Sequence, residues 1–168
     1  VTSWAVCISR PSDLGAWYDD AGFVLPSLEL VDHCVDVDYA RAQERGRLFA
    51  DDTASATTIW AEKRATLVER CALAAQLVDQ EPRETWIVWC DTNAEADALK
   101  GLLPGAVEVR GDMSPAEKER KLNAFSDGQA RIIITKADIA GFGLNWQHCG
   151  RQVFAGFTYS FEKIYQAL

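Results

Sequence analysis

Residues 86–90 read Trp-Ile-Val-Trp-Cys and residues 131–135 read Arg-Ile-Ile-Ile-Thr, and these two short apolar runs decide the fold that the sequence predicts. An unbroken apolar run of this length is typical of a strand that is buried on both faces in a parallel sheet. Shorter runs at 107–109 and 152–155 predict two further strands. The chain therefore carries the signals of a sheet with several parallel strands.

Helix signals lie between the predicted strands. Residues 91–93 (Asp-Thr-Asn) offer N-cap side chains for a helix that continues through Leu103. Residues 114–117 (Ser-Pro-Ala-Glu) begin a second helix, with a cap, a proline in the first turn and a capping-box glutamate. A longer helix is predicted over 55–78, where one apolar stripe holds Trp60, Leu67, Cys71, Ala74 and Val78. Strands that alternate with helices predict an α/β fold of three layers, with a mostly parallel sheet flanked by helices on both faces.

The first fifty residues are less regular. Residues 10–15 and 19–22 carry turn chemistry. Residues 28–39 then alternate between apolar and acidic side chains, with Val31, Val35 and Val37 on one side. This alternation predicts a strand with one buried face.

Length and composition narrow the class of protein. The chain has 168 residues, 48% of them hydrophobic, which fits one domain with a packed core and excludes a disordered chain. No apolar run approaches the roughly 18 residues of a membrane-spanning helix, and the first residues show no signal peptide. We therefore expect no membrane partner. A formal net charge of -8 argues against a free-standing protein that binds nucleic acid by charge alone.

The five cysteines indicate a reducing compartment. They are odd in number, widely spaced and contain no Cys-x-x-Cys pair, which is the usage of intracellular proteins rather than of a disulfide framework. We therefore expect a cytoplasmic protein. Two His-Cys pairs, at 33–34 and 148–149, could supply four zinc ligands. Adjacent ligands wrap one tetrahedral ion poorly, so we favour buried thiols beside ordinary histidines.

The richest chemistry lies in residues 135–147, which read Thr-Lys-Ala-Asp-Ile-Ala-Gly-Phe-Gly-Leu-Asn-Trp-Gln. A buried strand here delivers the Thr135 hydroxyl and the Lys136 ammonium to the carboxyl edge of the sheet, where such sheets bind ligands. A glycine-spaced loop follows, with the amides of Asn145 and Gln147. These groups suit an anionic ligand that carries a sugar. Taken alone, however, the stretch is better explained by a tight loop capped by polar side chains.

The order of the segments resembles the second RecA-like lobe of superfamily-two helicases and translocases, most closely the Swi/Snf-like ATPases and related phage-type helicases. Residues 86–93 resemble motif IV, residues 135–147 resemble motif V, and residues 153–167 resemble the segment that leads into motif VI. On this resemblance, residues 1–40 are a linker or extension from a preceding lobe. Residues 41–168 are the helicase C-terminal RecA-like lobe, ending before the motif VI arginines.

The resemblance implies two groups of site residues. The first group contacts the nucleic-acid backbone and consists of Asn93, Gly111, Thr135 and Lys136. The second group contacts ATP held between two lobes and consists of Gly143, Asn145, Gln147 and Gln166. Simpler interpretations stay open for some of them, because Asn93 could cap its helix, Thr135 could merely end a strand, and Lys136 could be a solvated charge.

The implied cofactors are ATP and Mg²⁺, with the Mg²⁺ ligands in the first lobe. These 168 residues contain neither a Gly-x-x-x-x-Gly-Lys-Ser/Thr loop nor an Asp-Glu-x-x motif. They also stop just after Gln166 and Ala167, where relatives continue with arginines. We therefore expect a fragment of a longer protein, inactive as an ATPase on its own.

The function that this resemblance implies is the second motor lobe of an ATP-dependent DNA helicase or translocase. Its partners would be DNA, with RNA as the other candidate, and the first RecA-like lobe. Two other functions stay open. The acidic residues 1–84 favour a non-catalytic protein-interaction module, and the Gly-x-Gly pair leaves a dinucleotide-binding enzyme, although the third glycine of that fingerprint is missing.

Overall fold

The central sheet brings the four predicted apolar runs side by side. The computed structural model describes residues 8, 10–23, 27–35 and 56–168. Within them, one sheet is formed in the order β2-β3-β1-β4 by β1 (Trp86–Trp89), β2 (Val107–Glu108), β3 (Ile132–Thr135) and β4 (Arg151–Phe154). Each neighbouring pair of these strands is parallel. The prediction of a largely parallel sheet is confirmed.

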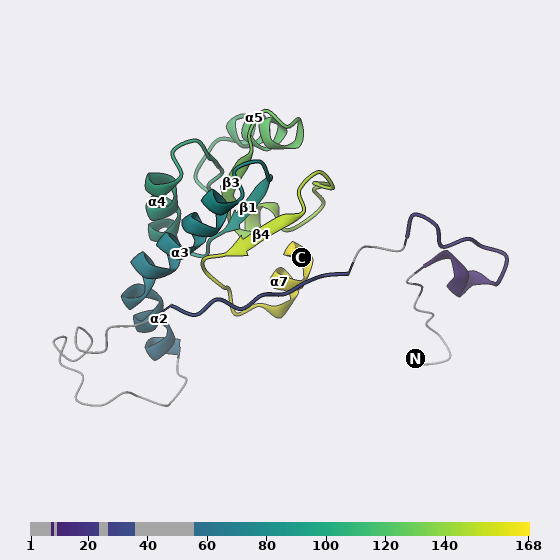
Figure 1. Ribbon diagram of the computed structural model, residues 1–168, viewed down its shortest axis with the longest axis horizontal. Coiled ribbons are helices and arrows are strands. Elements are labelled where there is room, and N and C mark those ends of the chain that lie inside the picture. Colours follow the sequence, from purple (N-terminus) through teal and green to yellow (C-terminus); the bar gives the residue numbers. More distant parts are fainter. Residues whose placement is uncertain (1–7, 9, 24–26, 36–55) are drawn as a thin grey trace. The chain divides into compact units, whose positions relative to one another are not determined.

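Alternate residues of the central strands pack into two different hydrophobic layers. Trp86 and Val88 share one cluster with buried residues of α3 (Leu67–Gln80) and α4 (Asn93–Leu102). Ile87 and Trp89 share another cluster with buried residues of three helices, α5 (Pro115–Ser126), α6 (Ala137–Ala140) and α7 (Phe161–Ala167). In Figure 1, α3 and α4 lie on one side of the strands and α7 on the other. The predicted three-layer α/β fold is confirmed.

The predicted helix over 55–78 is in fact two helices. α2 (Ala56–Ala65) and α3 are separated at Thr66. The Thr66 hydroxyl donates to the carbonyl oxygen of Glu62 at 2.8 Å, and a threonine that bonds back to its own helix in this way bends it. As a result the expected apolar stripe is buried only along α3, while Trp60 on α2 is 47% exposed.

The predicted strand over 28–39 is wrong for the residues that can be judged. Residues 27–35 have no regular secondary structure, and residues 36–39 lie outside the described residues. Leu28, Leu30 and Val31 are 63%, 70% and 62% exposed. A strand needs a neighbouring strand for its backbone hydrogen bonds, and within the described part of the chain this segment pairs with none. Alternation alone was therefore an insufficient signal.

The chain divides into two compact units, residues 1–34 and 35–168. In the first unit, a turn that contains the short 3-10 helix η1 (Pro11–Leu14) is closed by Asp20. The Asp20 carboxylate accepts hydrogen bonds from the Ser12 backbone N–H at 2.8 Å and from the Ser12 hydroxyl at 2.7 Å. These hydrogen bonds lower the pKa of Asp20. The predicted turn chemistry therefore forms a locally bonded structure.

α6 and α7 are additions to the predicted elements. They have four and seven residues, which is too short for the apolar periodicity that reveals a helix in a sequence. Both are nevertheless anchored in the same hydrophobic layer by small buried residues, Ala137, Ala140 and Ala167. None of the helices in the described part of the chain is long and apolar enough to cross a bilayer.

Leu99 and Leu102 allow a matched test of this core, since both lie on α4 but Leu99 is fully buried and Leu102 is 48% exposed. Leu99→Ala should lower the free energy of unfolding by about 2–5 kcal/mol, because it leaves a cavity between α4 and the sheet. Leu102→Ala should change it by less than about 0.5 kcal/mol. Chemical denaturation measures both, and equal losses would contradict the packing described here.

Candidate functional site

The carboxyl edge of the sheet collects polar residues from several strands. Because the strands are parallel, all of them end at this edge. β1 is followed by Asp91 and Asn93, β2 by Gly111, and β3 by Lys136. The order β2-β3-β1 therefore places Gly111, Lys136 and Asn93 just beyond the ends of neighbouring strands.

The turn between β1 and α4 is fixed by a capping box. The Thr92 hydroxyl accepts a hydrogen bond from the Glu95 backbone N–H at 3.2 Å. In return, one carboxylate oxygen of Glu95 accepts from the backbone N–H groups of Asp91 at 2.8 Å and Thr92 at 2.9 Å. Thr92 is thus the cap, and Asn93 is the exposed first residue of the helix. The interpretation of Asn93 as the cap is wrong.

Glu95 is a buried charge that is paired across two helices. Its side chain is 1% exposed, and its second carboxylate oxygen lies 2.8 Å from a guanidinium nitrogen of Arg70 on α3. Burial by itself would raise the pKa of Glu95, but the two backbone N–H groups of the turn and the Arg70 guanidinium outweigh it and lower the pKa. The carboxylate is therefore ionised at neutral pH.

Arg70 extends this network to the segment that leaves β4. Its guanidinium donates to the carbonyl oxygen of Ala155, to that of Lys63 at 2.8 Å, and through Nε to the Thr66 hydroxyl at 3.0 Å. The next residue, Gly156, packs directly against the Glu95 carboxylate, because a Cβ built at this position would overlap it. Only glycine leaves room there for the ion pair.

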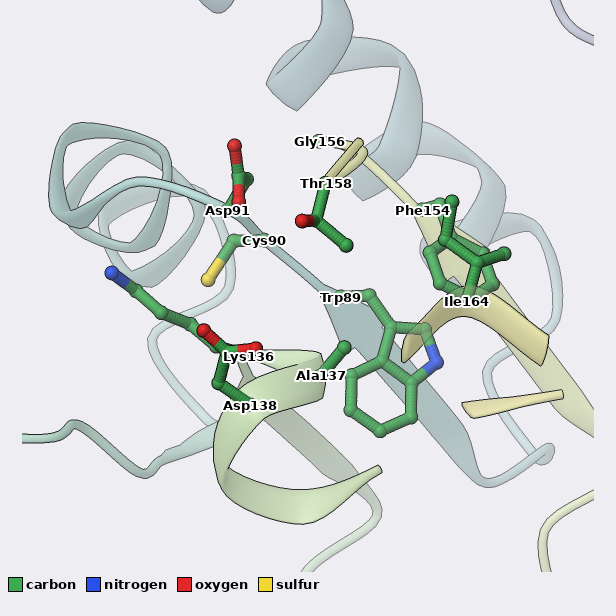
Figure 2. Close-up of a pocket in the computed structure, with 10 residues that line it drawn as sticks. All are labelled: Trp89, Cys90, Asp91, Lys136, Ala137, Asp138, Phe154, Gly156, Thr158 and Ile164. Carbon is green, nitrogen blue, oxygen red and sulfur yellow. The ribbon is translucent and has the colours of Figure 1, made fainter. Parts of the chain in front are cut away.

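A small pocket lies beside this network, at the ends of β1, β3 and β4. It spans about 320 Å³, including solvent at its mouth, and is lined by Trp89, Cys90, Asp91, Lys136, Ala137, Asp138, Phe154, Gly156, Thr158 and Ile164. Figure 2 shows Asp91 and Lys136 on one side of it, and Trp89, Phe154 and Ile164 on the other. The pocket thus combines charged and hydroxyl groups with an aromatic wall.

Two buried thiols lie near this edge. Cys71 of α3 and Cys90 at the end of β1 are free cysteines. Burial raises the pKa of Cys71 to about 11 and the pKa of Cys90 to about 12. Both thiols are therefore protonated at neutral pH, and each bonds a backbone carbonyl, Glu95 and Thr135 respectively.

Comparison with known proteins identifies the family. Residues 68–168 match the family described as the Helicase conserved C-terminal domain. The chain belongs to this family. The resemblance to the second RecA-like lobe of superfamily-two helicases is thereby confirmed.

Two individual proteins are similar to parts of this helicase C-terminal domain. DEAD-box ATP-dependent RNA helicase 46 of Arabidopsis thaliana is 32% identical over 87 residues, which are 50% of this chain and 13% of the plant protein. The crystal structure of the C-terminal part of the Fun30 ATPase domain superposes with a TM-score of 0.51 at 12% identity, covering 77% of this chain and 41% of that chain. At this identity the second likeness concerns the fold alone.

The residues implied to contact nucleic acid lie in different surroundings in the helicase C-terminal domain. Asn93 and Gly111 are exposed and Lys136 is partly buried beside the pocket. Thr135, by contrast, is 1% exposed, and its hydroxyl donates to the Val109 carbonyl oxygen at 3.4 Å. A direct contact through the Thr135 side chain is therefore closed off in this conformation.

The residues implied to contact ATP are exposed but do not line the pocket. Gly143, Asn145 and Gln147 lie on the loop between α6 and β4, and Gln166 lies on α7. Gly143 has φ of 69° in the left-handed region, which favours glycine. Trp146 anchors this loop, since the residue is 9% exposed and its Nε1 donates to the Ser126 hydroxyl at 2.9 Å.

Sequence reasoning missed the ion pair that organises this edge. The Thr92-to-Glu95 spacing fits the capping-box pattern, so the role of Glu95 in the turn was accessible. The pairing with Arg70 was not, because the two residues are 25 positions apart and lie on different helices. Gly156 was equally hidden, since a single glycine after a strand has many possible causes.

Glu95→Gln should lower the free energy of unfolding by about 3 kcal/mol at pH 7, because it leaves the Arg70 guanidinium without its charged partner. The pKa of Glu95 is lower in the folded state than the ordinary value of 4.5. The unfolded chain therefore binds a proton first as the pH falls, and the stability due to the carboxylate is present at neutral pH and lost below about pH 4.5.

Denaturation of both proteins between pH 3 and 7 measures this effect. The difference between wild type and Glu95→Gln should shrink as the pH falls. Glu119→Gln, an exposed change on α5, is the control and should stay within about 0.5 kcal/mol of wild type. A difference that is independent of pH would show that the charge of Glu95 is not what stabilises this edge.

Proposed function

We propose that the chain is the second motor lobe of an ATP-dependent DNA helicase or translocase. In this proposal it supplies contacts to the nucleic-acid backbone and part of an ATP site that it shares with a first RecA-like lobe. The observation that carries the proposal is the match of residues 68–168 to the helicase C-terminal domain family, on a parallel sheet whose polar residues follow adjacent strand ends. Residues 1–40 would be the linker from the first lobe.

The nucleic-acid contacts in this proposal fall on the carboxyl edge of the sheet. The first turn of α4 presents backbone N–H groups beside exposed Asn93, and such helix starts favour phosphate oxygens. Gly111 offers exposed backbone, and Lys136 offers the charge. Thr135 would act from beneath, by holding the strand end against the Val109 carbonyl.

The ATP contacts in this proposal fall on the loop between α6 and β4 and on α7. Asn145, Gln147 and Gln166 present exposed amides, and the backbone at Gly143 has open space around it. These groups suit the ribose and phosphates of a nucleotide. ATP would supply the free energy that closes and opens two lobes, and Mg²⁺ would be held by the first lobe.

A partner surface lies next to these residues. Phe157, Tyr159, Phe161 and Tyr165, on α7 and the segment before it, are 54%, 62%, 79% and 69% exposed. Exposed aromatic residues that gather in one segment are typical of interfaces. In the leading proposal their partner is the first lobe. In the alternative, a non-catalytic interaction module, the same residues would bind another protein.

The test is ATP hydrolysis by the full-length protein with single-stranded DNA, double-stranded DNA and RNA of one sequence. We expect turnover to rise with DNA. A rise with RNA alone would replace DNA by RNA in the proposal, which the named plant relative makes the natural second substrate. No turnover under any condition would favour the interaction module. Residence in the cytoplasm is part of the proposal and is tested by imaging the tagged protein.

Lys136→Ala in the full-length protein should weaken binding to DNA, because it removes one positive charge from the carboxyl edge. The slope of log affinity against log salt concentration should become shallower by about 1. Arg83→Ala is the matched control, since Arg83 is exposed just before β1, at the opposite edge of the sheet. Identical slopes for the two variants would remove Lys136 from the proposed contact.

A further inference from the structure

The segment between β4 and α7, residues 155–160, connects the carboxyl edge of the sheet to the helix that carries Gln166. At its start, the backbone N–H groups of Ala155 and Gly156 donate to the Trp89 carbonyl oxygen at 3.0 and 3.4 Å. Thr158 and Gly156 line the pocket together with Ile164 of α7. The path of this segment therefore sets where α7 lies.

Two cationic side chains on neighbouring helices donate hydrogen bonds to backbone carbonyl groups of this segment. Arg70 of α3 donates to the Ala155 carbonyl oxygen, and Lys63 of α2 donates to the Phe157 carbonyl oxygen. Lys63 also lies 4.8 Å from the centre of the Tyr159 ring, a cation–π distance. Residues 155, 157 and 159 of the segment are thus in contact with side chains of α2 and α3.

The same two cations are held by the turn between β1 and α4. The Lys63 ammonium lies 2.7 Å from the Asp91 carboxylate, and Arg70 lies 2.8 Å from Glu95. Glu95 in turn binds the backbone of that turn. Lys63, Arg70, Asp91 and Glu95 therefore form one ion cluster that joins the turn before Asn93 to the segment before α7.

We infer that this ion cluster couples the nucleic-acid contact at the start of α4 to the position of α7. The inference rests on the proposed function. A phosphate bound at the start of α4 shifts the turn that carries Asp91 and Glu95, and both carboxylates move with their cations. The cations then reposition residues 155–160 and the ATP-facing side of α7. Lys63 and Arg70 are positioning residues in this scheme, because they act through the backbone of residues 155–160.

Lys63 is the better residue for a test, because Arg70 is needed to pair the buried Glu95. Lys63→Met removes the ammonium and keeps the apolar stem. The matched control is Lys100→Met, since Lys100 also donates to two backbone carbonyls, of Pro104 at 2.8 Å and Ala106 at 2.6 Å. Those carbonyls lie at the other end of α4, away from the cluster.

The readouts are ATP turnover by the full-length protein with and without the nucleic acid that stimulates wild type, and affinity for that nucleic acid measured separately. Lys63→Met should reduce the stimulation on the order of tenfold while basal turnover and affinity stay unchanged. Lys63→Arg should restore part of the stimulation, and Lys100→Met should behave as wild type. This pattern separates coupling from a general loss of structure.

Full stimulation in Lys63→Met, or an equal loss of basal and stimulated turnover, would overturn the coupling while leaving the proposed function intact. A wild-type protein whose turnover ignores nucleic acid would instead overturn the proposed function and the coupling with it. A further measurement uses the wild-type protein alone, so that its result cannot be due to misfolding of a variant. Amide hydrogen exchange of residues 155–160 in wild type should slow when nucleic acid binds, and changes confined to residues 91–94 would overturn the inference.

Discussion

The arrangement of the carboxyl edge depends on one buried ion pair, between Arg70 and Glu95. Burying a carboxylate costs several kcal/mol unless its oxygens are fully bonded. Here one oxygen faces the guanidinium and the other faces two backbone N–H groups, so each part of the carboxylate has a partner. The cost of burial is offset by bonds that also fix a helix start, a strand exit and the contact between α3 and α4. An apolar residue in place of Glu95 would fill the space, but it would not orient the helix start, the strand exit or the contact between α3 and α4.

This pair gives the two edges of the candidate site different character. The β1–α4 turn is capped and paired, and it leads into a helix whose position the hydrophobic core fixes through Leu99. The loop between α6 and β4 is instead exposed along Gly143 to Asn145 and is anchored mainly through the Trp146 ring, which packs on Phe125 with a centroid distance of 5.0 Å. In the proposed function, the first of these segments would carry the nucleic-acid contact and the second would face ATP.

Most of the fold could be predicted from the sequence, because β1 and β3 are buried on both faces and because α4 and α5 begin with visible caps. The apolar run at Trp86 and the Ser114 cap required no knowledge of the rest of the chain. Residues 28–39 failed because alternation indicates a strand only when a neighbour supplies hydrogen bonds. The split at Thr66 was hidden because its cause is a side-chain bond rather than a change in periodicity. In the site, the parallel topology was enough to place Asn93, Gly111 and Lys136 at the carboxyl edge of the sheet. The burial of Thr135 and the ion pair between Arg70 and Glu95 could not be predicted, because they depend on packing between segments that are distant in the sequence.

The two enclosed thiols have a practical consequence. Alkylating reagents attack the thiolate, so groups with the raised pKa values of Cys71 and Cys90 are inert while the core stays shut. Cys71 becomes reactive only when α3 lifts away, and Cys90 only when the end of β1 is uncovered. Exposed Cys34 offers a contrasting label in the first unit. Because both thiols belong to the hydrophobic layer between the sheet and α3–α4, they are intrinsic chemical probes of breathing motions at two places in that layer.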